Sequence, residues 1–309
     1  MALNRRNFMH GAGALATGAA LSPLMPKAGF AASTLEIGEF RLDTVSDGLL
    51  NLPGDFSFAP MPQDELKPIL AQYGISRDRV SRPCNVTLLR DGERTILFDV
   101  GSGPDFVPTA GELVDTLDAL GVAPEDVTHV VFTHAHPDHL WGLLDDFDEP
   151  LFYEAEHMIG QAEWDYWTNP NTVDDIGEAR AAFAVGAKRR LDVIAETVTL
   201  FNDGQEILPG VAARATYGHT PGHMAFELRS GSNSAMIVGD SISNHHVSFV
   251  KPQWPTGSDE DPETAIKTRL LLLDQLASEQ MPLIGFHLPE GGVGRAERKD
   301  GAFVFTSEV

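Results

Sequence analysis

This sequence of 309 residues has few cysteines, long apolar runs or basic residues, and each shortage excludes some functions. Its single cysteine, Cys84, cannot form a disulfide within the chain. Beyond residues 1–32 no apolar run approaches the ~20 residues that a membrane-spanning helix needs, so we expect no stable membrane insertion. Basic residues are few, since 22 Lys and Arg stand against 45 Asp and Glu and leave a net charge of −23. That charge repels phosphate backbones, which argues against nucleic-acid partners and against a nuclease.

Residues 1–32 resemble an export signal of the twin-arginine type. Asn4-Arg5-Arg6-Asn7-Phe8-Met9 resembles the twin-arginine motif, small apolar residues follow over residues 11–24, and Ala31-Ala32 offers a cleavage region. An ordinary amphipathic start or a disordered tail is the alternative. Twin-arginine substrates engage the export machinery after folding, and often after metal loading, which would explain a periplasmic or secreted protein without disulfides. Residues 33–309, which we expect to form one domain, carry 19 basic and 45 acidic residues.

The first part of this domain is expected to be rich in antiparallel strands. Strands are expected over residues 35–44, 49–52, 86–90 and 95–98. The first two would flank the turn Ser46-Asp47-Gly48, and Asp91-Gly92 between the last two is a strong β-hairpin signal. The proline-rich connection over residues 53–83 is expected to be a loop with a short helix.

Helices and strands alternate in the rest of the chain. Helices are expected over residues 109–121, 155–167, 178–194 and 262–279. The first would begin at Thr109, which has capping-box spacing to Glu112, and the last would begin at the cap Asp261-Pro262. Further strands are expected over residues 128–133, 211–216, 224–229, 235–238 and 283–286. The pattern alone indicates a mixed α and β fold, with sheets packed together and helices outside.

Metal-binding side chains are concentrated in His134-Ala135-His136-Pro137-Asp138-His139, directly after the expected strand 128–133. Three imidazoles and a carboxylate so close together suit a borderline metal such as zinc. Further residues that can bind a metal follow the expected strands 211–216, 235–238 and 283–286. They lie in Gly218-His219-Thr220-Pro221-Gly222-His223, at Asp240 and at His287. Because strands fix the spacing of such residues and loops aim them, the sequence predicts a metal centre built from several strand ends.

The spacing H-x-H-x-D-H, with the later histidines and aspartate, resembles the metallo-β-lactamase superfamily. This resemblance implies an α/β (α+β) fold, namely an αββα sandwich. It also implies two divalent metal ions, with zinc expected first and manganese, iron or cobalt also compatible with the ligands. The implied ligands are His134, His136 and His223 for the first metal, Asp138, His139 and His287 for the second, and Asp240 as the bridging carboxylate.

The resemblance also implies supporting and catalytic roles. Asp99 and His219 would hydrogen-bond the ligand loops from behind, with a surface turn as the alternative for Asp99. The family holds a water or hydroxide between its two cations, which lower the pKa of that water. Asp240 would bridge the cations, and Asp138 would also pass a proton to the leaving group. His245 and His246 either line the site or belong to a solvated loop.

Finer features resemble the methyl parathion hydrolase-like group and the neighbouring lactonases, from about Gly38 to Phe305. These features are residues 42–48, residues 218–223, and Phe286-His287-Leu288-Pro289 followed by Gly292-Val293-Gly294. The group has a bulky apolar pocket above the metals, and the resemblance suggests a homodimer. The candidate pocket residues, for which core packing is the alternative, are Phe106, Trp164, Trp167 and Phe183. Such a pocket favours neutral aryl or acyl small molecules.

The sequence therefore predicts an exported hydrolase that uses a metal-bridging hydroxide on neutral ester-like bonds. Lactones, aryl esters and organophosphate triesters are the candidate substrates. A β-lactamase or a thioester hydrolase would use the same site. A mononuclear-iron persulfide dioxygenase is a further alternative, but the full second-metal set speaks against it. A metal-binding protein without catalysis is the remaining one.

Overall fold

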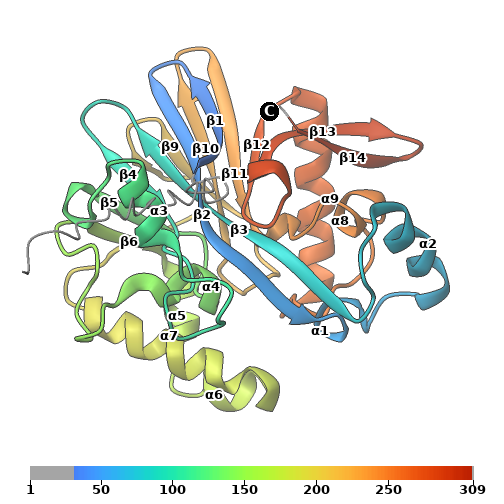
Figure 1. Ribbon diagram of the computed structural model, residues 1–309, viewed down its shortest axis with the longest axis horizontal. Helices are drawn as coiled ribbons and strands as arrows, with labels where there is room; N and C mark the ends of the chain where they lie inside the picture. Colours follow the sequence, from blue (N-terminus) through green and yellow to red (C-terminus); the bar gives the residue numbers. More distant parts are fainter. Residues whose placement is uncertain (1–30, 308–309) are drawn as a thin grey trace, which may run out of the picture.

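The computed structural model describes residues 31–307, which form two β-sheets of seven strands each (Figure 1). The first sheet consists, in spatial order, of β1 (Ala31–Ile37), β2 (Phe40–Pro53), β3 (Arg79–Arg90), β4 (Thr95–Phe98), β5 (His129–Phe132), β6 (Glu156–Gly160) and β7 (Thr199–Phe201). The second consists, in spatial order, of β14 (Ala302–Ser307), β13 (Val293–Lys299), β12 (Leu283–Gly285), β11 (Asn233–Gly239), β10 (Met224–Ser230), β9 (Val211–Ala215) and β8 (Glu206–Leu208). The expected hairpin of β3 and β4 is confirmed.

The helices lie outside the two sheets, the first two of them at the far end of β2 and β3 (Figure 1). They are α1 (Asp55–Phe58), α2 (Gln63–Tyr73), α3 (Leu113–Ala119), α4 (Pro137–Leu140), α5 (Gln161–Thr168), α6 (Thr172–Asp175), α7 (Ala181–Ile194), α8 (Val247–Val250) and α9 (Pro262–Glu279). α9 begins as expected, because Asp261 Oδ1 accepts a hydrogen bond from the Thr264 amide at 3.1 Å. Across residues 31–307, no helix has the length and apolar character needed to span a bilayer.

Three groups of buried side chains show how these layers pack. Phe98 of β4 and Phe226 of β10 meet between the sheets, with ring centroids 5.2 Å apart. A second group joins the outer face of the first sheet to α3 and α7, through residues such as Leu191. A third joins the outer face of the second sheet to α9, through Leu273 and Leu276. This order of helix, sheet, sheet and helix confirms the expected αββα sandwich.

The N-terminal strands differ from the prediction. The expected strand 35–44 is divided between β1 and β2, because the chain reverses at Gly38, whose φ is +58°. β2 then continues through the expected turn 46–48, where its pairing with β3 shifts register. Arg5, Arg6 and the export segment up to residue 30 lie outside the described residues. Ala31 pairs with Val45, so the expected cleavage region overlaps the start of β1.

The helix α3 begins at Leu113, four residues later than the capping-box spacing indicated. Asp47 of β2 is the reason. Its buried carboxylate accepts hydrogen bonds from the Leu113 amide at 3.1 Å and from the Ser102 amide at 2.7 Å. The helix N-terminus is therefore capped by a distant side chain rather than by Thr109.

The helix expected over residues 155–167 is wrong in its first half. Residues 156–160 form β6, which pairs in parallel with β5 and β7, and α5 begins only at Gln161. The apolar residues of this strand are buried on both faces of the sheet, so their spacing does not show the alternation of a half-exposed strand. The expected helices 178–194 and 262–279 are confirmed as α7, with a 3-10 turn before it, and α9.

Buried His157 on β6 is expected to make the fold sensitive to mild acid. Burial lowers the pKa of His157 from 6.5 to about 4, and its Nε2 has no hydrogen-bond partner among residues 31–307. Between these pKa values the unfolded chain binds more protons than the folded chain, so stability falls as the pH drops below about 6.5. We expect His157→Asn to reduce this acid-induced loss by about 2 kcal/mol at about pH 5. Urea unfolding at about pH 5 and 7.5 measures it, and equal losses in both proteins would contradict the assignment.

Candidate metal centre

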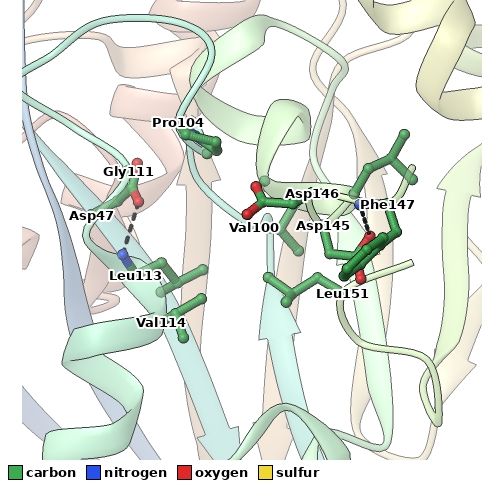
Figure 2. A pocket seen from close by; sticks show the side chains of 13 residues that line it. Asp47, Val100, Pro104, Gly111, Leu113, Val114, Asp145, Asp146, Phe147 and Leu151 are labelled. Atoms are coloured by element: carbon green, nitrogen blue, oxygen red, sulfur yellow. Dashed lines mark hydrogen bonds between the residues drawn. The ribbon is translucent and has the colours of Figure 1, made fainter. Parts of the chain in front are cut away.

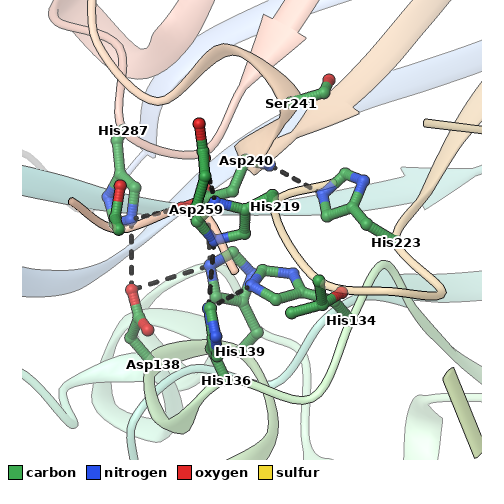
Figure 3. Close-up of polar contacts among 12 residues, drawn as sticks. His134, His136, Asp138, His139, His219, His223, Asp240, Ser241, Asp259 and His287 are labelled. Atoms are coloured by element: carbon green, nitrogen blue, oxygen red, sulfur yellow. Dashed lines mark hydrogen bonds and ion pairs between the residues drawn. The ribbon is translucent and has the colours of Figure 1, made fainter. Parts of the chain in front are cut away.

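The predicted metal-binding residues meet at one edge of the sandwich, where strands of both sheets end (Figure 3). His134 and His136 follow β5, and Pro137 begins the short helix α4 that carries Asp138 and His139. From the second sheet, the β9–β10 connection carries residues 218–223, β11 leads into Asp240, and β12 leads towards His287. All these histidines and aspartates are buried. These are the residues that the sequence marked as candidate ligands, and the structure brings them together.

Three imidazoles form the first group of candidate ligands. His136 Nδ1 lies 3.1 Å from His134 Nε2 and 3.0 Å from His219 Nε2. The three nitrogens all lie within 4.8 Å of one another, as ligands of a common ion do. Three neutral imidazole nitrogens are a suitable set for a zinc-like cation.

Two carboxylates and two imidazoles form the second group. His287 Nε2 lies 3.1 Å from Asp138 Oδ2 and 3.3 Å from Asp240 Oδ2. His139 Nε2 lies 3.6 Å from Asp138 Oδ2 and 3.5 Å from Asp240 Oδ1. Asp240 Oδ2 is also 3.4 Å from His219 Nε2, which belongs to the first group. Asp240 therefore reaches both groups, as a bridging carboxylate must.

The structure orients His219 and His223 differently from the arrangement that the sequence indicated. His223 Nε2 accepts a hydrogen bond from the Asp240 amide at 2.9 Å, and its Nδ1 lies 2.8 Å from Thr216 Oγ1. Both ring nitrogens of His223 thus already have protein partners, and no lone pair remains for a metal. His219 instead presents Nε2 to His136 and Asp240. The expectation that His223 is the ligand and His219 the supporting residue does not fit this geometry.

Carboxylates from two parts of the chain orient three of the histidines. Asp99 Oδ2 accepts from His139 Nδ1 at 2.8 Å, as expected, and also binds the Thr133 hydroxyl. Asp259 Oδ1 lies 3.0 Å from His219 Nδ1, and Glu260 Oε1 lies 3.2 Å from His136 Nε2. A carboxylate on the outer nitrogen fixes the tautomer of an imidazole and turns its other nitrogen towards a metal.

The electrostatics of the centre favour a bound cation. Burial alone would lower the pKa of His139, but the Asp138, Asp99 and Asp240 carboxylates raise it to about 10. Burial would raise the pKa of Asp240, yet the His287 and His139 imidazoles hold it well below its usual range. His139 Nε2 and Asp240 Oδ1 are buried and lack a hydrogen-bond partner within the described chain. Ionised carboxylates beside unpartnered donor atoms fit divalent cations, which would replace protons here.

Glu163 of α5 is a supporting residue that sequence reasoning missed. Its buried carboxylate accepts hydrogen bonds from the Ala135 amide at 2.9 Å, Trp167 Nε1 at 2.6 Å, Thr220 Oγ1 at 2.7 Å and the Gly222 amide at 3.0 Å. Burial raises its pKa to about 7, against the effect of these donors. Glu163 thus ties the loop of His134 and His136 to the loop of His219. Nothing in its own sequence neighbourhood signals this role.

The four expected pocket aromatics are only partly brought together. Phe183 and Trp167 have ring centroids 6.0 and 5.8 Å from that of His136, and Phe106 stacks edge-on against Phe183 at 5.8 Å. Trp167 is only 1% exposed and belongs to the core, and half-buried Trp164 packs against the same core. Phe106 and Phe183 therefore form an aromatic wall beside the first group of ligands.

A separate cavity of about 290 Å³ lies among residues of the first half of the chain (Figure 2). Its lining includes Asp47, Val100, Leu113 and Phe147, and none of the candidate metal ligands or pocket aromatics is among its lining residues. Val100 donates its amide to the His139 carbonyl at 2.9 Å, so this cavity is separated from the metal centre by the backbone of the ligand loop.

Comparison with known proteins gives consistent matches. A family model described as the metallo-beta-lactamase superfamily matches residues 80–287. AidC, a dizinc quorum-quenching lactonase solved with a product, is 26% identical with a TM-score of 0.84, and the match covers 90% of this chain and 97% of AidC. The hydrolase AbOPH, of the beta lactamase superfamily, is 26% identical with a TM-score of 0.82, over 89% of this chain and 97% of that one.

A protein of a vertebrate is also similar to this chain, over a shorter region. Metallo-beta-lactamase domain-containing protein 1 of Xenopus laevis is 32% identical over 162 residues, which is 52% of this chain. The match spans 64% of the frog protein's length, slightly less than two thirds.

Proposed function

The chain belongs to the metallo-β-lactamase superfamily, and from this premise we propose that it is a dinuclear-metal hydrolase of neutral ester-like bonds, with lactones as the leading substrate class. The observation that carries the proposal is the position of Asp240, whose Oδ2 lies 3.4 Å from His219 Nε2 and 3.3 Å from His287 Nε2. One carboxylate thus serves two groups of ligand atoms. A mononuclear site would not need the second group.

The proposed ligand sets follow the geometry. His134, His136 and His219 would hold the first metal, Asp138, His139 and His287 the second, and Asp240 both. When bound, two divalent cations supply a low pKa for water and polarisation of the substrate oxygen. Zinc suits the histidine-rich first set, and manganese, iron or cobalt are accepted by the same donors.

The remaining residues are proposed to bind and orient the substrate. Phe183 and Phe106 form an apolar wall beside His136 that suits an acyl or aryl group. Asp138, held 3.1 Å from His287 Nε2, is proposed to pass a proton to the leaving group in addition to its ligand role. The similarity to a dizinc lactonase over nearly the whole chain supports lactones as the first substrate class to test.

The cellular setting is a separate part of the proposal. The motif containing Arg5 and Arg6 supports export by the twin-arginine route to the periplasm or the exterior, and it lies outside the described residues. A homodimer is proposed from the resemblance to the methyl parathion hydrolase-like group.

Initial rates on two neutral substrates test the proposed function. Metal-loaded protein is assayed with a six-membered aryl lactone and with a neutral aryl phosphotriester, with Asp240→Asn as the blank. We expect the lactone rate to dominate. A dominant phosphotriester rate would instead support the methyl parathion hydrolase-like assignment. Activity on neither substrate, with turnover of a β-lactam, a thioester or a persulfide under oxygen uptake, would overturn the proposal in favour of that chemistry.

A further inference from the structure

Arg82 of β3 is a buried cation without an ion-pair partner. The residue is 4% exposed, and its Nη2 donates to the neutral Ser57 hydroxyl at 2.5 Å. Its Nε has no hydrogen-bond partner, and it forms no salt bridge, within residues 31–307. Burial lowers the pKa of Arg82, but arginine keeps its charge in proteins. A buried charge left in this state is strongly unfavourable unless a further group neutralises it.

Arg82 lies beside the metal centre. Alternate residues of a strand face the same side, so Arg82 shares its side of β3 with Cys84. The Cys84 sulfur lies within 4.8 Å of ligand atoms of Asp138 and His287. The next residue along the strand, Pro83, accepts a hydrogen bond from His287 Nδ1 at 2.8 Å. The guanidinium is therefore positioned at the margin of the proposed active site.

The nearby carboxylates do not satisfy this charge. Asp138, Asp240 and Asp259 are close enough to raise the pKa of Arg82, yet none lies within salt-bridge distance of it. Asp138 and Asp240 are proposed metal ligands, so bound cations would take up their negative charge. Asp259 is held by His219 and by the buried Arg269, whose Nη1 lies 3.4 Å from Asp259 Oδ2. With metals bound, no nearby carboxylate would be left to offset the positive charge of Arg82.

His246 adds a second buried group without partners. It is 3% exposed, and neither ring nitrogen has a hydrogen-bond partner in the described part of the chain. Burial lowers its pKa to about 3, with the charge of Arg82 contributing, so the ring is neutral and can donate one hydrogen bond. Its ring centroid lies 6.1 Å from that of Phe58, the neighbour of Ser57 in α1. Ser57 and His246 thus belong to the surroundings of Arg82. Buried polar groups in native proteins are nearly always hydrogen-bonded, so unpartnered groups gathered in one place call for a further partner there.

We propose that Arg82, Ser57 and His246 form an anion subsite beside the metal centre, which binds a carboxylate carried by the substrate away from its scissile bond. This inference rests on the proposed function. The planar guanidinium matches the two oxygens of a carboxylate, and the Ser57 and His246 groups supply further donors. A single guanidinium in a chain of net charge −23 suits a singly charged carboxylate better than a phosphate dianion. The substrate class is therefore a lactone or ester with a carboxylate substituent.

Two esters that differ only at the tail test the subsite by turnover. They are 4-nitrophenyl hexanoate and the 4-nitrophenyl monoester of adipic acid, in which a carboxylate replaces the terminal methyl group. We expect Arg82→Met to lower the ratio of kcat/KM for the adipate ester over the hexanoate ester by about tenfold to a hundredfold, mainly through KM. Arg82→Lys, which keeps the buried charge but not the planar donor pair, is expected to lower it less.

The matched control is Arg79→Met. Arg79 lies on the same strand, is exposed, and its replacement changes the net charge by the same amount. The ratio should stay at the wild-type value in this variant. A ratio that is unchanged in both Arg82→Met and Arg82→Lys, with metal content and melting temperature at wild-type level, would overturn the subsite. So would an equal fall in the Arg79→Met protein.

A binding measurement separates failure of the subsite from failure of the proposed function. Calorimetry of the metal-loaded protein compares the anilide of hexanoic acid with the monoanilide of adipic acid, which requires no turnover. We expect tighter binding of the acidic anilide, and loss of that preference in Arg82→Met. If neither ester is hydrolysed but this preference appears, the hydrolase proposal fails and the subsite stands. A preference that survives Arg82→Met would show that the carboxylate binds the metals, and would overturn the subsite.

Discussion

Replacement of Asp240 by Asn is expected to remove at least one of the two proposed metals and to lower kcat on the best substrate by roughly a thousandfold or more. The physical reason is the position of the carboxylate between two ligand groups, 3.4 Å from His219 Nε2 and 3.3 Å from His287 Nε2. An amide carries no negative charge, and it would put a nitrogen in place of one of the two oxygens that face His139, His219 and His287, so it binds cations far more weakly. Metal content by elemental analysis and kcat on the aryl lactone measure the two effects together.

The control for this substitution is Asp118→Asn, which makes the same chemical change on the exposed surface of α3. It should keep both metals and the wild-type rate. Full activity with unchanged metal content in Asp240→Asn would refute the bridging assignment. Loss of metal without loss of turnover would refute the hydrolytic role of the centre and leave a structural one.

Substitutions of His219 and His223 are expected to have very different effects. His219→Ala should lose the first metal and lower kcat by roughly a thousandfold, because its Nε2 is one of three imidazole nitrogens in the first group. His223→Gln should keep both metals, with affinity reduced by roughly tenfold to a hundredfold, because His223 only supports the backbone amide of Asp240. The number of metal sites, found by calorimetric titration of the metal-free protein, distinguishes the two.

Each of these variants is the control for the other, since both remove a buried imidazole from the same connection. The reverse result, with one metal lost in His223→Gln and both retained in His219→Ala, would restore the ligand set expected from the sequence. Loss of one metal in both variants would show that the connection acts as a unit and that the structure does not separate the two roles.

The sequence could point to this cluster of candidate ligands because its main parts are local. Four candidate ligands fall between His134 and His139, and Asp240 and His287 follow strands that their composition indicated. The different orientations of His219 and His223 could not be predicted from the sequence in the same way, since both residues lie in one short connection. Which one faces the centre depends on how that connection packs. Gly218, with φ +120°, lies so close to the backbone of Ala265 that a side chain would clash there.

The supporting residues were missed for a related reason. Glu163 accepts hydrogen bonds from residues 28 and 59 positions away in the chain, and Asp259 lies 40 positions from His219. The spacing of neighbouring residues does not predict contacts between such distant parts of the chain. In the same way, the Asp261 cap of α9 was predicted from neighbouring residues, whereas the start of α3 was not, because its cap is the distant Asp47.

The position of β12 in the second sheet has a consequence for the order in which the protein assembles. This strand, which leads to His287, lies between β11 and β13, and its end is fastened to the first half of the chain. The Asn85 side chain donates to the Leu288 carbonyl at 2.8 Å, across 203 positions of sequence. Contacts this distant form late, because the closure of a long loop costs entropy before any contact compensates for it. The last of the proposed metal ligands therefore arrives only when both sheets are joined, so a fully loaded centre would identify a chain that has finished folding.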